Sequence, residues 1–70
     1  MKEFLVKVAE IIEVESVVPE FEFRTVEDWD SMKGFALIVM IQRDYGRELT
    51  VPEFVKCNTV LELAHAAGVC

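Results

Sequence analysis

The run from Ser31 to Tyr45 constrains the fold most, because it contains no proline and carries a helix-boundary signal at each end. Asp30 is a good N-cap, since its short carboxylate can accept a hydrogen bond from an unpaired backbone N–H of the first turn. Gly46 suits the left-handed conformation in which many helices end. The run therefore predicts a helix over 31–45. Gly34 is its weak point, because glycine costs up to about 1 kcal/mol relative to alanine inside a helix.

The N-terminal part of the chain divides into a helix and a loop. From Lys2 to Glu13, apolar residues recur at helical spacing with charged residues between them, which predicts an amphipathic first helix. The stretch from Val14 to Asp30 contains Pro19 and no sustained hydrophobic period, so we expect a long loop there. The apolar side chains that can point inward from this loop are Phe21, Phe23 and Val26.

Two capping boxes organise the C-terminal part. Thr50 is followed three residues later by Glu53, with a proline in between, which predicts a short helix of about a turn or two. Thr59 and Glu62 repeat the pattern, and apolar residues then continue at helical spacing until Gly68. The expected fold is all-α: a four-helix bundle with a long loop between the first two helices and a short third helix.

Length and charge narrow the class of protein. Seventy residues are expected to form one domain, 1–70, with little room for an enzyme's substrate pocket. Thirteen acidic and seven basic residues give a net charge of -6, which would repel nucleic acid and anionic membrane surfaces. No apolar run approaches the roughly 20 residues that cross a bilayer. Charged residues interrupt the N-terminus where a secretory signal would be apolar, so we expect a cytoplasmic protein. We also expect a monomer.

The cysteines and the histidine indicate neither a metal site nor a catalytic group. Cys57 and Cys70 are expected to remain reduced thiols, because nothing in the sequence indicates secretion. They share no ligand spacing with each other or with His65. Ser31 and His65 do not form a recognisable nucleophile and base, since the glycines of a nucleophile elbow are missing around the serine. His65 is expected to be a surface or boundary residue.

The sequence Asp30-Ser31-Met32 places a hydroxyl in the first turn of the predicted second helix, directly after the long loop. A helix N-terminus favours a phosphate group, because its backbone N–H groups are unpaired and its dipole is positive. Taken alone, however, an Asp-Ser pair at a helix start is usually an ordinary cap. Together with the long loop, the helix ending at Tyr45-Gly46, the short helix and Thr59-Val60, the motif resembles the acyl carrier protein family over nearly the whole chain.

This resemblance implies a function. In that family a serine in an Asp-Ser-Leu motif begins the second helix and receives 4′-phosphopantetheine. Ser31 would then carry this prosthetic group, and Asp30 would help to recruit the metal-dependent phosphopantetheinyl transferase. Met32 stands in the place of the usual leucine and is similar in volume. The implied protein is a non-catalytic carrier that tethers acyl intermediates as thioesters for fatty-acid, polyketide or related biosynthesis.

The implied partners are the transferase and the acyl-loading and acyl-processing enzymes. The motif also resembles that of D-alanyl carrier proteins, so an aminoacyl cargo is an alternative. A further alternative is an unmodified helical interaction module that has kept the carrier fold.

Two features depart from the family pattern. Glu27-Asp28-Trp29 replaces the usual Leu-Gly approach to the serine, and we expect Trp29 to pack against the loop. If Leu37, Ile38, Ile41 and Tyr45 face the core, the opposite face of the helix carries no acidic residue, although family members often have acids there. This opposite face consists of Met32, Phe35, Ala36, Val39 and Arg43, which we expect to take part in transferase and partner recognition. This face is either exposed for docking or buried on more than one side.

Overall fold

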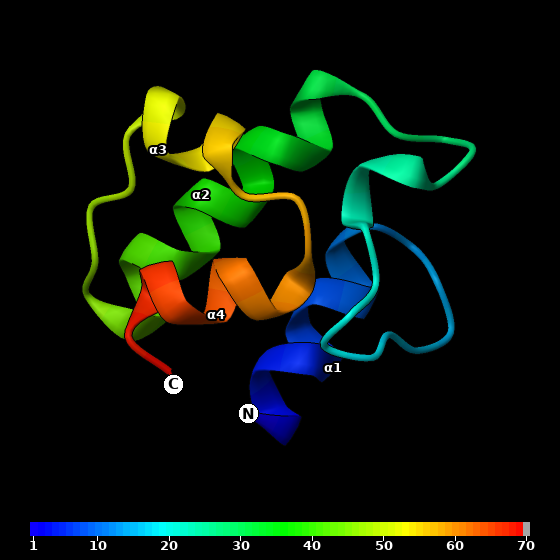
Figure 1. The fold of residues 1–70 in the computed structure, drawn as a ribbon, viewed down its shortest axis with the longest axis horizontal. Helices are drawn as coiled ribbons and strands as arrows, with labels where there is room; N and C mark the ends of the chain where they lie inside the picture. The colour runs from blue at the N-terminus through cyan, green and yellow to red at the C-terminus, as the bar shows by residue number, and fades with distance from the viewer. Residues whose placement is uncertain (70) are drawn as a thin grey trace.

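The computed structural model describes residues 1–69 and shows a helical fold, with no strand in that part of the chain (Figure 1). A short 3₁₀ helix, η1, interrupts the long loop. The elements are α1 (Lys2–Ile11), η1 (Phe23–Thr25), α2 (Ser31–Tyr45), α3 (Val51–Lys56) and α4 (Val60–Ala67). The predicted fold class is confirmed, and so are the predicted bounds of the second helix. None of the described helices has the length and apolarity that a membrane crossing needs.

The first helix ends at Ile11 rather than at Glu13, so its predicted end is wrong. Glu13 adopts the left-handed conformation, with φ of 59°. The N–H of Glu13 donates to the carbonyl of Glu10, and that of Val14 donates to the carbonyl of Ala9 at 3.0 Å. This pattern is a Schellman C-cap. The sequence hides it, because glycine is the residue that usually takes the left-handed position.

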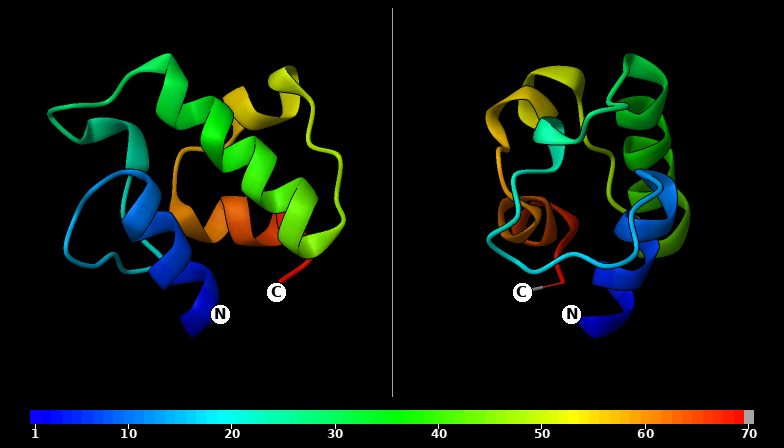
Figure 2. Two further views of the ribbon diagram at one scale, coloured as in Figure 1. Left: turned by 180° about the vertical axis from the view of Figure 1, so that it is seen from behind. Right: turned by 90° about the vertical axis from the view of Figure 1, so that its right-hand side faces the viewer.

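The three longer helices, α1, α2 and α4, pack against one another around one apolar core, as the two views of Figure 2 illustrate. Of the four predicted core residues of α2, Leu37 and Ile41 are fully buried, whereas Ile38 and Tyr45 pack against the core with partial exposure. The largest fully buried side chains come from all these helices, η1 and the end of α1: Phe4, Val8, Ile12, Phe23, Leu37, Ile41, Val60 and Leu63.

The long loop is fixed to the core and to α4. Phe23 is fully buried, and Phe21 and Val26 pack against the core with partial exposure, as predicted. The loop also supplies hydrogen-bond acceptors: the carbonyl of Phe21 accepts from Val60 N at 2.9 Å, and that of Pro19 accepts from Leu61 N at 2.8 Å. These two bonds satisfy N–H groups at the start of α4 that have no partner within the helix.

Cys57 is buried, and His65 is exposed to solvent. Cys57 is a free thiol at the end of α3, and burial raises its pKa above the ordinary value. A thiol held in its protonated form is a poor nucleophile. His65 lies on the surface of α4, as expected. Cys70 lies outside the described residues.

Candidate functional site

The start of α2 is capped by Asp30, as predicted. Asp30 has an extended backbone, and its Oδ1 accepts a hydrogen bond from the backbone N–H of Lys33 at 2.9 Å. Ser31 follows as the first residue of the helix and is exposed to solvent. Because the aspartate acts as the cap, the helix does not need the serine hydroxyl for this purpose. The hydroxyl therefore remains accessible to other chemistry.

Ser31 lies at the edge of a largely apolar groove of about 450 Å³ between α2 and α3. Residues from α2, α3 and the loop line it: Arg24, Trp29, Ser31, Met32, Gly34, Phe35, Ile38, Val51, Phe54 and Val55. His65 on α4 is not among them, so the structure does not bring Ser31 and His65 together in this groove. The sequence predicts Ser31, Met32 and Phe35 as site residues, and all three line the groove. It does not predict that residues of α3 line the groove as well.

Aromatic side chains form one wall of this groove. The rings of Trp29 and Phe54 are stacked, with centroids 6.5 Å apart and an interplanar angle of 15°. Phe23 packs against both rings from the core side, at centroid distances of 5.6 and 5.5 Å. The prediction that Trp29 packs against the loop is confirmed. The same ring also lines the groove beside Ser31.

Gly34 allows this aromatic wall to approach α2. A Cβ atom at Gly34 would lie 3.2 Å from Cε2 of Phe54 and 3.3 Å from Cζ2 of Trp29, which is tighter than ordinary van der Waals contact. The packing therefore favours the glycine that weakens the helix on propensity grounds. Its missing side chain leaves the space that the two rings occupy.

Arg24 is a site residue that sequence reasoning missed. Its guanidinium donates to the carbonyl oxygens of Phe54 and Cys57, both at 2.6 Å, near the end of α3. It also lies 5.0 Å from the ring centroids of Phe23 and Phe54. An arginine within an irregular loop gives no signal of such a role in sequence. In the structure it fixes α3, and hence one side of the groove, to η1.

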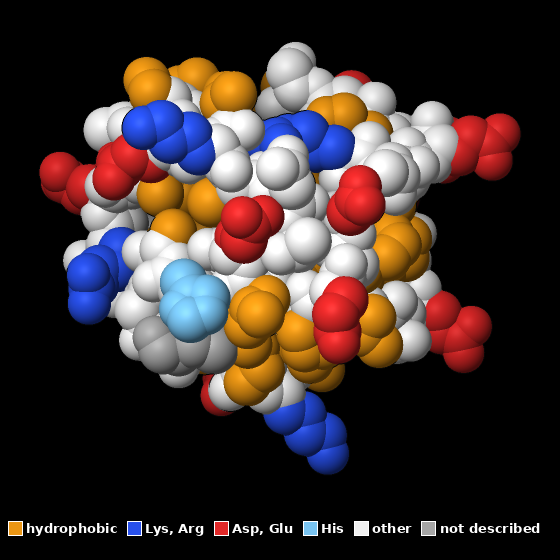
Figure 3. Space-filling model, in the orientation of Figure 1, with side chains coloured by type: hydrophobic (Ala, Val, Ile, Leu, Met, Phe, Trp, Pro, Cys, Tyr) orange, Lys and Arg blue, Asp and Glu red, His pale blue; other side chains and the backbone are white. Residues whose placement is uncertain are grey.

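The outward face of α2 is exposed rather than buried. The exposed fractions are 72% for Met32, 63% for Phe35 and 38% for Val39, while Ala36 is half-buried. Two valines of α3 extend this face across the groove, with exposed fractions of 65% for Val51 and 61% for Val55. We call Met32, Phe35, Val39, Val51 and Val55 the α2–α3 apolar surface. Figure 3 shows hydrophobic side chains gathered at the edge of the molecule where α3 lies.

The charged residues of α2 are paired within the protein. Arg43 and Lys7 both bind Asp44, at 3.1 and 3.2 Å, and the pKa of the Asp44 carboxyl is lowered, first by its hydrogen bond with Arg43 and then by that with Lys7. Lys33 points back toward the loop, and only 11% of its side chain is exposed. Along α2, therefore, no acid precedes Asp44, which is paired with Arg43 and Lys7.

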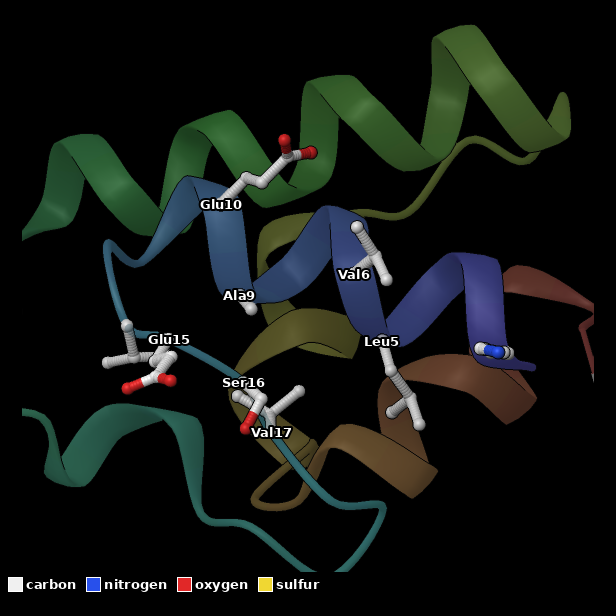
Figure 4. Close-up of a pocket in the computed structure, with 9 residues that line it drawn as sticks. Leu5, Val6, Ala9, Glu10, Glu15, Ser16 and Val17 are labelled. Carbon is white, nitrogen blue, oxygen red and sulfur yellow. The ribbon is translucent and has the colours of Figure 1, made fainter.

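A second groove, of about 430 Å³, lies between α1 and the first residues of the loop (Figure 4). Leu5, Val6 and Ala9 line it from α1, and Val17 lines it from the loop. None of the residues that the sequence singled out as site residues contributes to it. The exposed serine of this second groove, Ser16, lies in the loop, whereas the exposed serine of the first groove, Ser31, begins a helix.

Comparison with known proteins identifies one family that matches nearly the whole chain. The model of one protein family, described as the phosphopantetheine attachment site, matches residues 3–67 of the chain. Searches of curated proteins and of solved structures gave no significant match. The family match covers every helix of the fold and the groove between α2 and α3.

Proposed function

The chain belongs to the phosphopantetheine-attachment family of carrier proteins, and from this premise we propose that it carries acyl intermediates on an arm attached to Ser31. The domain of this family is the attachment site for covalent 4′-phosphopantetheine. The observation that carries the proposal is the exposed Ser31 at the first position of α2, where Asp30 already caps the helix.

The local structure fits a phosphodiester at this serine. The first backbone N–H groups of α2 and its dipole favour a negative charge at that end of the helix. The oxygen of Ser31 would bond to phosphorus, displacing adenosine 3′,5′-bisphosphate from coenzyme A, and the hydroxyl would lose its proton. When bound, the group supplies a terminal thiol that holds acyl groups as thioesters. The buried thiol of Cys57 is poorly placed for that role.

Carrier domains of this family interact with phosphopantetheinyl transferases and with acyl-processing enzymes. We propose that these partners, and acyl-loading enzymes, dock on the outward face of α2, and that Asp30 is part of the transferase contact. The exposure of Met32 and Phe35 supports this docking role. The remaining proposed contacts are Ala36, Val39 and Arg43, to which the structure adds the neighbouring valines of α3.

We further propose that residues 1–70 act as one monomeric, cytoplasmic carrier domain that catalyses no reaction itself. The cargo would come from fatty-acid, polyketide or related biosynthesis. The alternative cargo is an aminoacyl group such as D-alanine. Loading tests with an acyl ligase and with an amino-acid-activating ligase separate these two, because only the enzyme of the right class forms a thioester on the modified protein.

Intact-mass measurement tests the attachment to Ser31. The protein is co-expressed with a broad-specificity phosphopantetheinyl transferase, beside the variants Ser31→Ala and Ser16→Ala. Ser16 is exposed in the loop and serves as the matched control. We expect a mass gain of one phosphopantetheine in the wild type and in Ser16→Ala, and none in Ser31→Ala. Absence of the gain in the wild type with several transferases would favour the unmodified interaction module.

A further inference from the structure

Lys33 connects the first turn of α2 to two segments that precede it in the chain. Its Nζ donates to the backbone carbonyl of Asp28 at 2.8 Å and lies 3.4 Å from Oε1 of Glu13. Its backbone N–H also donates to the side chain of Asp30. One residue thus holds both the loop that leads into Ser31 and the end of α1.

The bond to Asp28 acts directly on the path of the chain into the site. Only Trp29 and Asp30 separate the carbonyl of Asp28 from Ser31. Trp29 N donates to the carbonyl of Val26 at 3.1 Å, so a backbone bond also closes the turn that contains Asp28. A bond from a charged donor to a carbonyl is stronger than one between neutral groups. Its loss would release the carbonyl of Asp28, which lies in the turn from Val26 to Trp29 just before the helix.

The carboxylate of Glu13 helps to keep the ammonium group in this place. Glu13 is the left-handed residue of the C-cap of α1, so its position is fixed by the end of that helix. Its side chain is 75% exposed, whereas that of Lys33 is 11% exposed. The lysine is therefore mostly covered by its own protein. A partner enzyme that touches Ser31 has little of the Lys33 side chain available to contact.

We propose that Lys33 is a positioning residue for the modification of Ser31. By holding the carbonyl of Asp28, it fixes the turn that presents the Ser31 hydroxyl to a phosphopantetheinyl transferase. This inference rests on the proposed function. Because transfer to a hydroxyl depends strongly on its orientation toward the reacting phosphorus, a looser turn slows the reaction even when the helices remain folded.

Two substitutions release this contact in different ways. Lys33→Met keeps a long apolar side chain but removes the donor. Glu13→Lys leaves Lys33 intact but places a like charge beside its ammonium group, at a position where the side chain is 75% exposed. Each is expected to lower kcat/KM for transfer from coenzyme A about tenfold. Lys33→Arg, which keeps a charged donor, is expected to restore most of the rate.

Matched controls separate positioning from loss of charge or stability. Lys2→Met and Glu20→Lys make the same two chemical changes at exposed positions away from Lys33, and both are expected to react as the wild type does. Emission from Trp29, the one tryptophan of the chain, reports the loop and is expected to shift in Lys33→Met and Glu13→Lys. Circular dichroism at the assay temperature identifies the variants that remain folded.

Rates of the folded variants then decide between the outcomes. Wild-type kcat and KM in Glu13→Lys, or in a folded Lys33→Met, would overturn the positioning role while leaving the attachment to Ser31 intact. An equal loss in Lys33→Arg would also overturn it. If the wild type itself gains no mass, or if Ser31→Ala still does, the proposed function fails instead.

Discussion

At the scale of single residues, Gly34 shows how packing can outweigh helix propensity. The rings of Phe54 and Trp29 come so close to α2 that even a Cβ atom would meet them at 3.2 and 3.3 Å. Replacing this glycine by alanine would strengthen the isolated helix by up to about 1 kcal/mol. Valine gains less helix propensity over glycine than alanine does, and its larger side chain displaces the two aromatic rings further.

Gly34→Val is therefore expected to lower the free energy of unfolding by about 2–3 kcal/mol, because overpacking forces the aromatic wall away from the helix. Urea denaturation measures this change. Ala36→Val is the matched control, since Ala36 is a half-buried residue of the same helix outside the aromatic wall, and the expected cost there is about 0.5 kcal/mol. Equal costs for the two variants would show that the rings move aside freely.

Arg24 provides a second prediction at this scale. Its guanidinium binds two carbonyl oxygens of the α3 region at once, which the single ammonium group of a lysine does poorly. We expect Arg24→Lys to cost about 1–2 kcal/mol of unfolding free energy. Arg43→Lys should cost much less, because Arg43 is exposed and, among the residues that the structure describes, pairs with the adjacent Asp44. If Arg24→Lys were as mild as the control, these bonds would not stabilise α3.

The residues that sequence reasoning could and could not identify differ in a physical way. Asp30 and Ser31 were predictable, because an N-cap and its first helical residue are defined by their immediate neighbours. Arg24, Gly34 and Phe54 act through contacts between segments far apart in the chain. A single sequence does not state which loop residue meets which helix, so their roles became visible only in the fold.

At the scale of elements, local signals defined the helices well wherever side-chain chemistry marks a boundary. Both capping boxes form as predicted, with Thr50 and Thr59 as the caps. The exception is the end of α1, where Glu13 takes a position that glycine usually occupies. The η1 helix was also missed, since a single 3₁₀ turn has no hydrophobic period to detect.

The glutamates of the two capping boxes should make stability depend on pH. Backbone hydrogen bonds lower the pKa of Glu53 and of Glu62 below the ordinary value of 4.5, chiefly from Thr50 for Glu53 and from Asn58 for Glu62. Each folded carboxyl holds its proton less tightly than the unfolded one. The stabilisation is therefore fully present above a pH of about 4.5 and is lost as the pH falls through the lower, folded pKa.

We expect the double variant Glu53→Gln, Glu62→Gln to lose part of this dependence, because a glutamine carbonyl can still accept the backbone bonds but does not titrate. Urea denaturation at a series of pH values below 5 measures the slope of unfolding free energy with pH. Glu20→Gln, at an exposed loop position, is the control and should keep the wild-type slope. Identical slopes in the double variant would assign the acid sensitivity to other carboxyls.

At the scale of the whole molecule, the sequence predicted the number and order of the α-helices but not the surface that two of them build together. The α2 half of the α2–α3 apolar surface follows from helical period alone, whereas Val51 and Val55 join it because α3 packs beside the start of α2. Most acidic residues behind the net charge of -6 lie outside α2, since α2 has no acid before Asp44. The molecule is acidic, but the face beside Ser31 is apolar.

This distribution predicts how a transferase recognises the protein. Phe35 is 63% exposed and lines both the α2–α3 groove and a third groove, of about 340 Å³, on the outward face of α2. Phe35→Ser should therefore leave the unfolding free energy nearly unchanged but raise the KM of the transferase for the protein about tenfold. Val6→Ser, at a 52% exposed position on α1, should leave the KM unchanged. Steady-state kinetics of phosphopantetheine transfer give both values.

Salt separates apolar docking from docking by charge in the same assay. Attraction between an acidic carrier and a basic enzyme patch weakens steeply as ions screen it, whereas apolar contact does not. Because α2 carries no acid before Asp44, the KM of the wild type should change less than about threefold between roughly 50 and 200 mM salt. Asp30 is the acid nearest to Ser31 in sequence, and its carboxylate already binds the N–H of Lys33. A steep rise of KM with salt, together with a normal KM for Phe35→Ser, would mean that partners read the overall negative charge of the protein instead of this apolar face.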